Sequence, residues 1–196
     1  MKHIIVALVS ALLLLATLPA QARVINRDEA NEYFANCMSK KSDAVKVETL
    51  TTLCACTSAR LMQSLTAEEL HALSGKDAVA QAATHKMLTE VYAPCSETIA
   101  VDLINFECVN NEQLSDMNPD FDVPMVCGCS ARSAAAWYQG KGKALMAEIL
   151  KANPNVTDPV PALLAHPQMK NQILSNLVAC SATPPTPPAT PAPAVK

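Results

Sequence analysis

Hydrophobic residues recur along most of the chain with the spacing of an α-helix. Between Val47 and Leu65, for example, Leu50, Cys54, Leu61 and Leu65 fall on one stripe, which is typical of a helix with one buried face. No stretch alternates convincingly with a period of two, so we expect little or no β-strand. The pattern predicts an all-α fold.

Capping and helix-breaking residues set the expected ends of these helices. Thr66 and Glu69 form a capping box that opens a short helix, and Pro94 is expected to end a long one. Ser96 is expected to cap the next helix, and Gly140 to interrupt a later one. We predict helices over 27–40, 45–65, 67–73, 77–92, 96–110, 126–139, 143–152 and 167–180, with connectors at 115–124 and 153–161.

The first 22 residues have the pattern of a secretory signal peptide. A positive charge at Lys2 precedes the apolar run from Ile4 to Leu18, and the A-x-A sequence of Ala20–Ala22 is typical of a cleavage site. We expect cleavage after Ala22 and export to the periplasm or the extracellular space. No later segment is apolar for long enough to span a bilayer, so no stable membrane insertion is expected after cleavage.

The last 16 residues, 181–196, consist mainly of proline, alanine and threonine, with one charge. Proline does not sustain a helix, and this segment has no large apolar side chain to bury. We expect a disordered, extended tail, which leaves 23–180 as the folded part of the chain.

All eight cysteines follow the expected cleavage site. An even number of cysteines in an exported chain indicates a disulfide framework, so we expect every one to be bonded. These residues are Cys37, Cys54, Cys56, Cys95, Cys108, Cys127, Cys129 and Cys180.

The cysteine spacing repeats. The first four follow the pattern C-x16-C-A-C-x38-C and the second four follow C-x18-C-G-C-x50-C, which suggests a duplicated helical unit. We therefore expect two tandem disulfide-stapled modules of three to four helices each, over 23–95 and 96–180. The two modules are either separate or packed as one domain.

Helix geometry limits the disulfide pairing. Residues two apart on a helix point about 200° apart, so the two cysteines of a C-x-C reach different neighbouring helices. Two pairings then remain in the first module: Cys37–Cys54 with Cys56–Cys95, or Cys37–Cys56 with Cys54–Cys95. The same choice applies to the second module, and the sequence leaves it open.

Composition and charge narrow the expected partners. Ala, Leu, Met, Lys and Glu are abundant and aromatic residues make up only 4% of the chain, a composition that favours helices. Without Lys2, the mature chain has 14 basic and 18 acidic residues, a formal charge of −4. With no basic run, nucleic acid and anionic membrane surfaces are not expected partners.

No motif predicts catalysis, a cofactor or a metal. Thiol–disulfide enzymes usually carry C-x-x-C after a strand, whereas C-x-C in a helix favours a structural role. His71, His85 and His166 show no ligand spacing, and hydrolase motifs are absent from the sequence. We expect no catalytic, cofactor-binding or metal-binding residues.

The function that remains is a non-enzymatic protein-interaction module of the cell envelope or the extracellular space. Its partner would be another protein in that compartment, in an adaptor, immunity or assembly-factor role. One alternative is a carrier of a lipid or other apolar ligand in a cavity between helices. Another is a thiol–disulfide oxidoreductase that uses the C-x-C motifs.

Overall fold

The computed structural model describes residues 22–117, 122–156 and 159–182, and this part of the chain is all-helical. It contains no β-strand, only an isolated bridge between Val24 and Thr66. The expected signal peptide and most of the expected tail lie outside the described residues. The elements are α2 (Arg27–Met38), α3 (Val47–Ser64), α4 (Ala67–Ala72), α5 (Ala78–Lys86), η1 (Met87–Tyr92), η2 (Ala93–Cys95), α6 (Glu97–Val109), α7 (Glu112–Met117), α8 (Val123–Gln139), α9 (Gly142–Ala152), α10 (Val160–Ala165) and α11 (Pro167–Ala182).

The long predicted helices are confirmed, and the differences lie at the connectors. The expected connector at 115–124 holds the end of α7 and the start of α8, and the expected loop at 153–161 ends in α10. Both α8 and α10 begin with a proline in the first turn. There the missing N–H costs nothing, because the first turn of a helix has no intrahelical acceptor for it. The last helix, α11, also continues two residues beyond Cys180.

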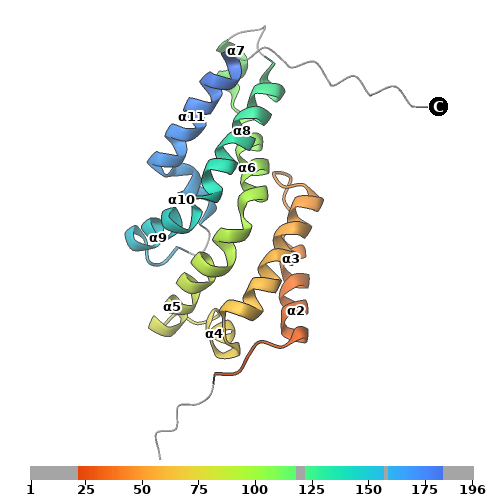
Figure 1. The fold of residues 1–196 in the computed structure, drawn as a ribbon, viewed down its shortest axis with the longest axis vertical. Helices are drawn as coiled ribbons and strands as arrows, with labels where there is room; N and C mark the ends of the chain where they lie inside the picture. The colour runs from red at the N-terminus through yellow and green to blue at the C-terminus, as the bar shows by residue number, and fades with distance from the viewer. Residues whose placement is uncertain (1–21, 118–121, 157–158, 183–196) are drawn as a thin grey trace, which may run out of the picture.

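The elements α5, η1, η2 and α6 follow one another along one rod (Figure 1). The predicted helix end before Pro94 and the predicted helix start at Ser96 are confirmed, since the π-helical stretch η1 ends at Tyr92 and Ser96 is the N-cap residue of α6. Between these two ends, Pro94 lies in the short 3-10 helix η2, and Ser96 itself is not helical. The Ser96 side chain makes no capping bond to α6, and its hydroxyl donates to the Ala93 carbonyl instead.

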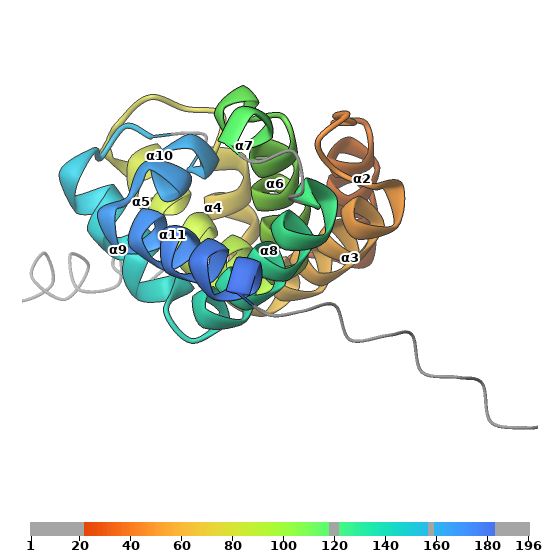
Figure 2. The same ribbon diagram turned by 90° about the horizontal axis from the view of Figure 1, so that it is seen from above.

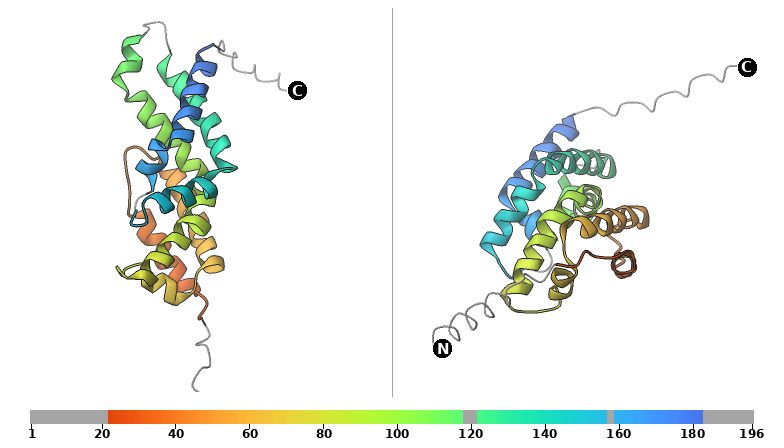
Figure 3. Two further views of the ribbon diagram at one scale, coloured as in Figure 1. Left: turned by 90° about the vertical axis from the view of Figure 1, so that its left-hand side faces the viewer. Right: turned by 60° about the horizontal axis from the view of Figure 1, so that its bottom comes forward.

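The rod lies between the two groups of helices that carry the C-x-C motifs. Figure 2 shows α2 and α3 on one side of it, with α9, α10 and α11 on the other. Helix α3 contacts η1 and α6, while α8 packs on both α6 and α11. The side view in Figure 3 shows a molecule that is long along the rod and narrow across it.

The core is continuous from one cysteine module to the other. The largest cluster lies around Tyr138 and Met169 in the second module, and a smaller one around Leu61 and Val91 in the first. A third cluster joins Leu88 and Ala93 of the rod to Met146 and Leu150 of α9, and a fourth joins α3 to the start of α6. The predicted module boundary at 95/96 coincides with the end of η2, and apolar contacts join the residues on its two sides.

None of the described helices is both long enough and apolar enough to cross a membrane.

Candidate functional site

Four disulfides use all eight cysteines, as the even count predicts. Each outer cysteine before a C-x-C bonds to the first cysteine of that motif, and each outer cysteine after it bonds to the second. The structure thus selects the same one of the two open pairings in both modules. The bonds are Cys37–Cys54, Cys56–Cys95, Cys108–Cys127 and Cys129–Cys180, with Cα–Cα distances between 5.6 and 6.0 Å.

The cysteines of the two C-x-C motifs are buried to the same degree. The first cysteine of each, Cys54 and Cys127, is fully buried, and the second, Cys56 and Cys129, is half-buried. No bond forms within either motif, and no thiol is free. Each motif therefore cross-links its helix to a neighbour on either side, and the oxidoreductase alternative stays a prediction.

A serine hydroxyl, half-buried at Ser58 and fully buried at Ser130, follows each motif and joins it to a neighbouring helix. Ser58 of α3 donates a hydrogen bond to the Ala30 carbonyl of α2 at 2.8 Å. Ser130 of α8 donates to the Ile173 carbonyl of α11 at 3.2 Å. These contacts supplement the disulfide in fixing each helix pair, because a buried hydroxyl is costly without a partner.

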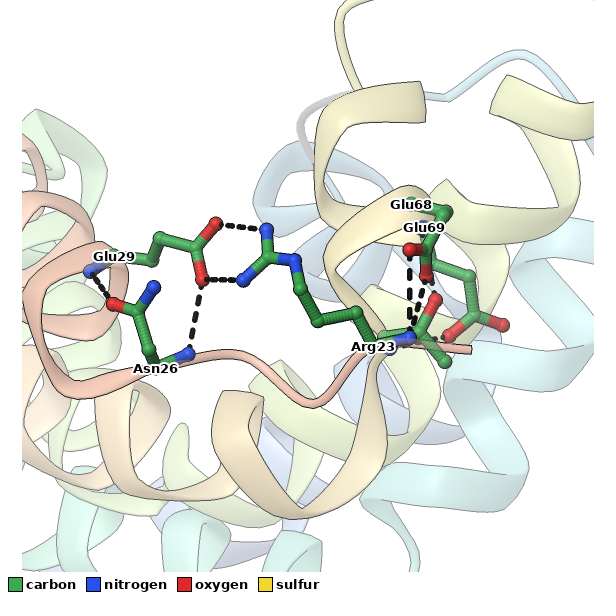
Figure 4. A network of polar contacts seen from close by, with 6 residues as sticks. Arg23, Asn26, Glu29, Glu68 and Glu69 are labelled. Carbon is green, nitrogen blue, oxygen red and sulfur yellow. Dashed lines mark hydrogen bonds and ion pairs between the residues drawn. The ribbon is translucent and has the colours of Figure 1, made fainter. Parts of the chain in front are cut away.

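A polar network fixes the chain just after the expected cleavage site (Figure 4). The Arg23 guanidinium donates to both carboxylate oxygens of Glu29, at 2.6 and 2.9 Å. Glu29 also accepts from the Asn26 backbone and completes a capping box for α2. The side-chain bond from Arg23, with the backbone bond from Asn26, lowers the pKa of Glu29 to about 2.

A second capping box opens α4, as the sequence predicts. The Thr66 side chain accepts from the Glu69 backbone N–H, and Glu69 accepts from the Thr66 backbone N–H. Lys86 of the rod donates to both Glu69 oxygens at 2.8 Å. Burial raises the pKa of Glu69, but the bonds from Lys86 and Thr66 lower it by more.

The histidines considered as metal ligands lie in three separate places. His71 is exposed on α4, His85 faces the Pro154 carbonyl at 2.9 Å, and His166 lies 3.3 Å from Glu148. Within the described ranges, no group of three or more His, Cys, Asp or Glu side chains is placed to hold a metal ion. The absence of a cofactor stays a prediction.

One pocket of about 400 Å³ lies between the start of α5 and the segment after α9. Its walls include Asp77, Thr84 and Asn155. The Gln81 side chain crosses between them, donating to the Pro154 carbonyl and to Asn155 at 3.2 and 3.1 Å. The Asp77 carboxylate accepts from the Ala80 backbone N–H at 2.8 Å and the Thr84 hydroxyl donates to the Ala80 carbonyl at 2.9 Å, so several polar groups of the pocket already have partners.

An apolar groove, called here the α11 groove, runs between α11 and the α6–α7 corner. It has a volume of about 310 Å³. Leu174 of α11 lines it and is 60% exposed, and Val178, one turn further along α11, is 71% exposed. Glu107 and Lys170 are its charged residues. The apolar lining is Ile104, Cys108, Leu114, Leu164, Ile173, Leu174 and Leu177.

Sequence reasoning did not identify this groove. The available signal was the pair of adjacent apolar residues Ile173–Leu174, repeated one turn later at Leu177–Val178. Such pairs give α11 an apolar surface wider than one packing face needs. The inner members turn toward the body of the molecule, and the outer members stay in solvent.

The fold and the site define a class of protein: an all-helical chain stapled by four consecutive disulfides, with an apolar groove on its last helix. Comparisons with protein-family models, with curated proteins and with solved structures found no match. Function is therefore inferred from this chain's own residues.

Proposed function

We propose that this chain is an exported interaction protein that binds an apolar helix of another envelope or extracellular protein in the α11 groove. The observation that carries the proposal is the exposure of Leu174 in the groove and of Val178 one turn further along α11. Large apolar side chains at i and i+4 next to a groove form the surface that a partner helix covers. The four disulfides support an oxidising compartment.

The disulfide framework also supports binding by a preformed surface. Cys108 lies in the groove, and its bond to Cys127 fixes α6 to α8. Cys129–Cys180 fixes α8 to α11. Both walls of the groove are thus cross-linked to α8, so little conformational entropy is lost when a partner binds.

Site-specific photocrosslinking in cells tests this proposal. A photoreactive residue at position 174 is expected to capture one defined partner from the envelope, and Val178→Lys is expected to abolish that capture. Val79→Lys is the matched control, because Val79 is similarly exposed at 65% but lies on α5. Capture that survives Val178→Lys, or is lost equally with Val79→Lys, would contradict the proposal.

The apolar lining also suits the second candidate, a carrier of an acyl chain or similar ligand. The groove volume is at the lower end of the range for small-molecule sites, about 300–1,000 Å³. Native mass spectrometry of the exported protein separates the two functions. A co-purifying lipid, displaced by Leu174→Lys but not by Val79→Lys, would favour the carrier over protein binding.

A further inference from the structure

The residues immediately after the expected cleavage site are held against α4. The Arg23 carbonyl accepts from the Ala67 backbone N–H at 2.9 Å, and Val24 forms the isolated bridge with Thr66. Ile25 is only 3% exposed and packs in the core of the first module. The chain is therefore integrated into the fold from Arg23 onward.

The backbone nitrogen of Arg23 faces a carboxylate. It lies 3.2 and 3.4 Å from the two oxygens of Glu68 (Figure 4). In an uncleaved chain this nitrogen is an amide that has one N–H and no charge. After cleavage of the Ala22–Arg23 bond the same nitrogen becomes an ammonium, which has three N–H donors and a full positive charge.

We propose that the α-ammonium group of Arg23, produced when the leader is removed, binds Glu68 and anchors the new N-terminus to α4. The leader is removed by hydrolysis: a signal-peptidase-type protease catalyses the attack of water on the Ala22–Arg23 amide, and the C–N bond breaks. The hydroxyl goes to the Ala22 carbonyl carbon, which leaves as a carboxylate. The nitrogen takes the remaining proton and a second one from solvent.

The two neighbouring glutamates already have side-chain partners, so Glu68 is the carboxylate that can pair with the new ammonium. Glu29 is paired with the Arg23 guanidinium and Glu69 with Lys86. Among the ion pairs between side chains of the described residues, none involves Glu68. A charge-assisted hydrogen bond is stronger than a neutral one, so the contact gains strength when the leader is removed.

The pairing has a defined dependence on pH. A free α-amino group has a pKa of about 7.7–8.0, and the Glu68 carboxylate raises it in the folded state. The stabilisation by this ion pair is therefore complete below about pH 7.7 and is lost as pH rises through the raised pKa of the α-amino group. The pKa of Glu68 is lowered by hydrogen bonds from its own backbone and from Thr66, and Arg23 lowers it further. The ion pair therefore persists into mild acid.

Two full-length proteins made from a cleavable fusion test the anchor, one beginning at Arg23 and one keeping Gln21–Ala22. We expect the extension to lower the melting temperature by about 2–4 °C. When both proteins also carry Glu68→Gln, their melting temperatures should be equal. Glu48→Gln is the matched control, because Glu48 is also an exposed first-turn glutamate but belongs to α3. When both proteins carry Glu48→Gln, the difference between their melting temperatures should persist.

Reactivity of the α-amine gives a second readout that does not depend on stability. At about pH 7.5, an amine-directed acylating reagent should label Arg23 several-fold more slowly in the wild type and in Glu48→Gln than in Glu68→Gln. Mass spectrometry of the exported protein should find Arg23 as the first residue. A different first residue, or equal labelling rates in the wild type and Glu68→Gln, would overturn the proposal.

Discussion

Tyr138 shows how a single side chain joins α8 to the start of α6. It is 1% exposed in the largest core cluster, and its hydroxyl lies 2.9 Å from the Ser96 hydroxyl of the rod. Burial raises its pKa, while the bond with Ser96 opposes that shift. Local sequence does not predict the partner of Tyr138, because the contact joins residues 42 apart.

The glycines near Tyr138 give a sharp test of this packing. A Cβ at position 142 would lie 2.7 Å from Tyr138 Cζ, whereas at position 140 the nearest atom is 3.9 Å away. Gly142→Ala should therefore reduce the free energy of unfolding by about 1–3 kcal/mol. Chemical denaturation measures the change.

Gly140→Ala is the control for that substitution. It should leave the free energy of unfolding unchanged or raise it by about 0.4–1 kcal/mol, since alanine restricts the unfolded chain more than glycine. Equal losses in both variants would show that the Tyr138 ring does not limit position 142.

At the scale of elements, α3 receives its N-terminal cap from another helix. Lys46 makes no capping bond with its own side chain. The carboxylate of Asp102, 8% exposed on α6, accepts from the Lys46 backbone N–H at 3.0 Å and lies 3.6 Å from its ammonium. A buried acid on α6 thus fixes the start of α3 across the module boundary.

Asp102→Ala should reduce the free energy of unfolding by about 1–2 kcal/mol, the usual effect of losing a cap. Asp102→Asn should recover part of it, because its amide oxygen can still accept. Lys46→Ala should have little effect, because its side chain is 74% exposed. Denaturant melts compare the three; a larger loss with Lys46→Ala than with Asp102→Ala would assign the contact to the surface ion pair instead.

The predictability of each element follows from what stabilises it. Capping boxes at Asn26 and Thr66 and stripes such as that of α3 are local signals, and the corresponding helices are where they are expected. The six-residue helices α7 and α10 were missed, because so short a helix has no periodicity and depends on tertiary packing. Pro94 and Ser96 predict the ends of the flanking helices, but neither predicts the π-helical and 3-10-helical turns that connect α5 to α6.

At the scale of the whole molecule, the rod and the shared clusters make the two cysteine modules interdependent. Lys143 of α9 also pairs with Glu90 of η1 across the boundary. The repeat in the sequence limits each module to the same two pairings, but it predicts neither which pairing forms nor how the modules pack. The α11 groove was unpredictable for the same reason, because its walls come from helices far apart in sequence.

We expect one cooperative unfolding transition for the oxidised protein. Hydrogen exchange followed by mass spectrometry across a denaturant series should give the same midpoint for peptides from α3 and from α8. Met146→Ala is the informative variant, because the fully buried Met146 packs on the rod in the shared cluster; it should lower both midpoints together. Two separate midpoints in the wild type would show that the modules fold independently.

The order of the disulfides bears on how the chain acquires them. Each bond joins cysteines that are consecutive in the sequence, and each loop closes before the next begins. For a chain that enters an oxidising compartment N-terminus first, pairing each cysteine with the next to emerge gives the native set directly. Oxidation in order of arrival then needs no rearrangement by an isomerase.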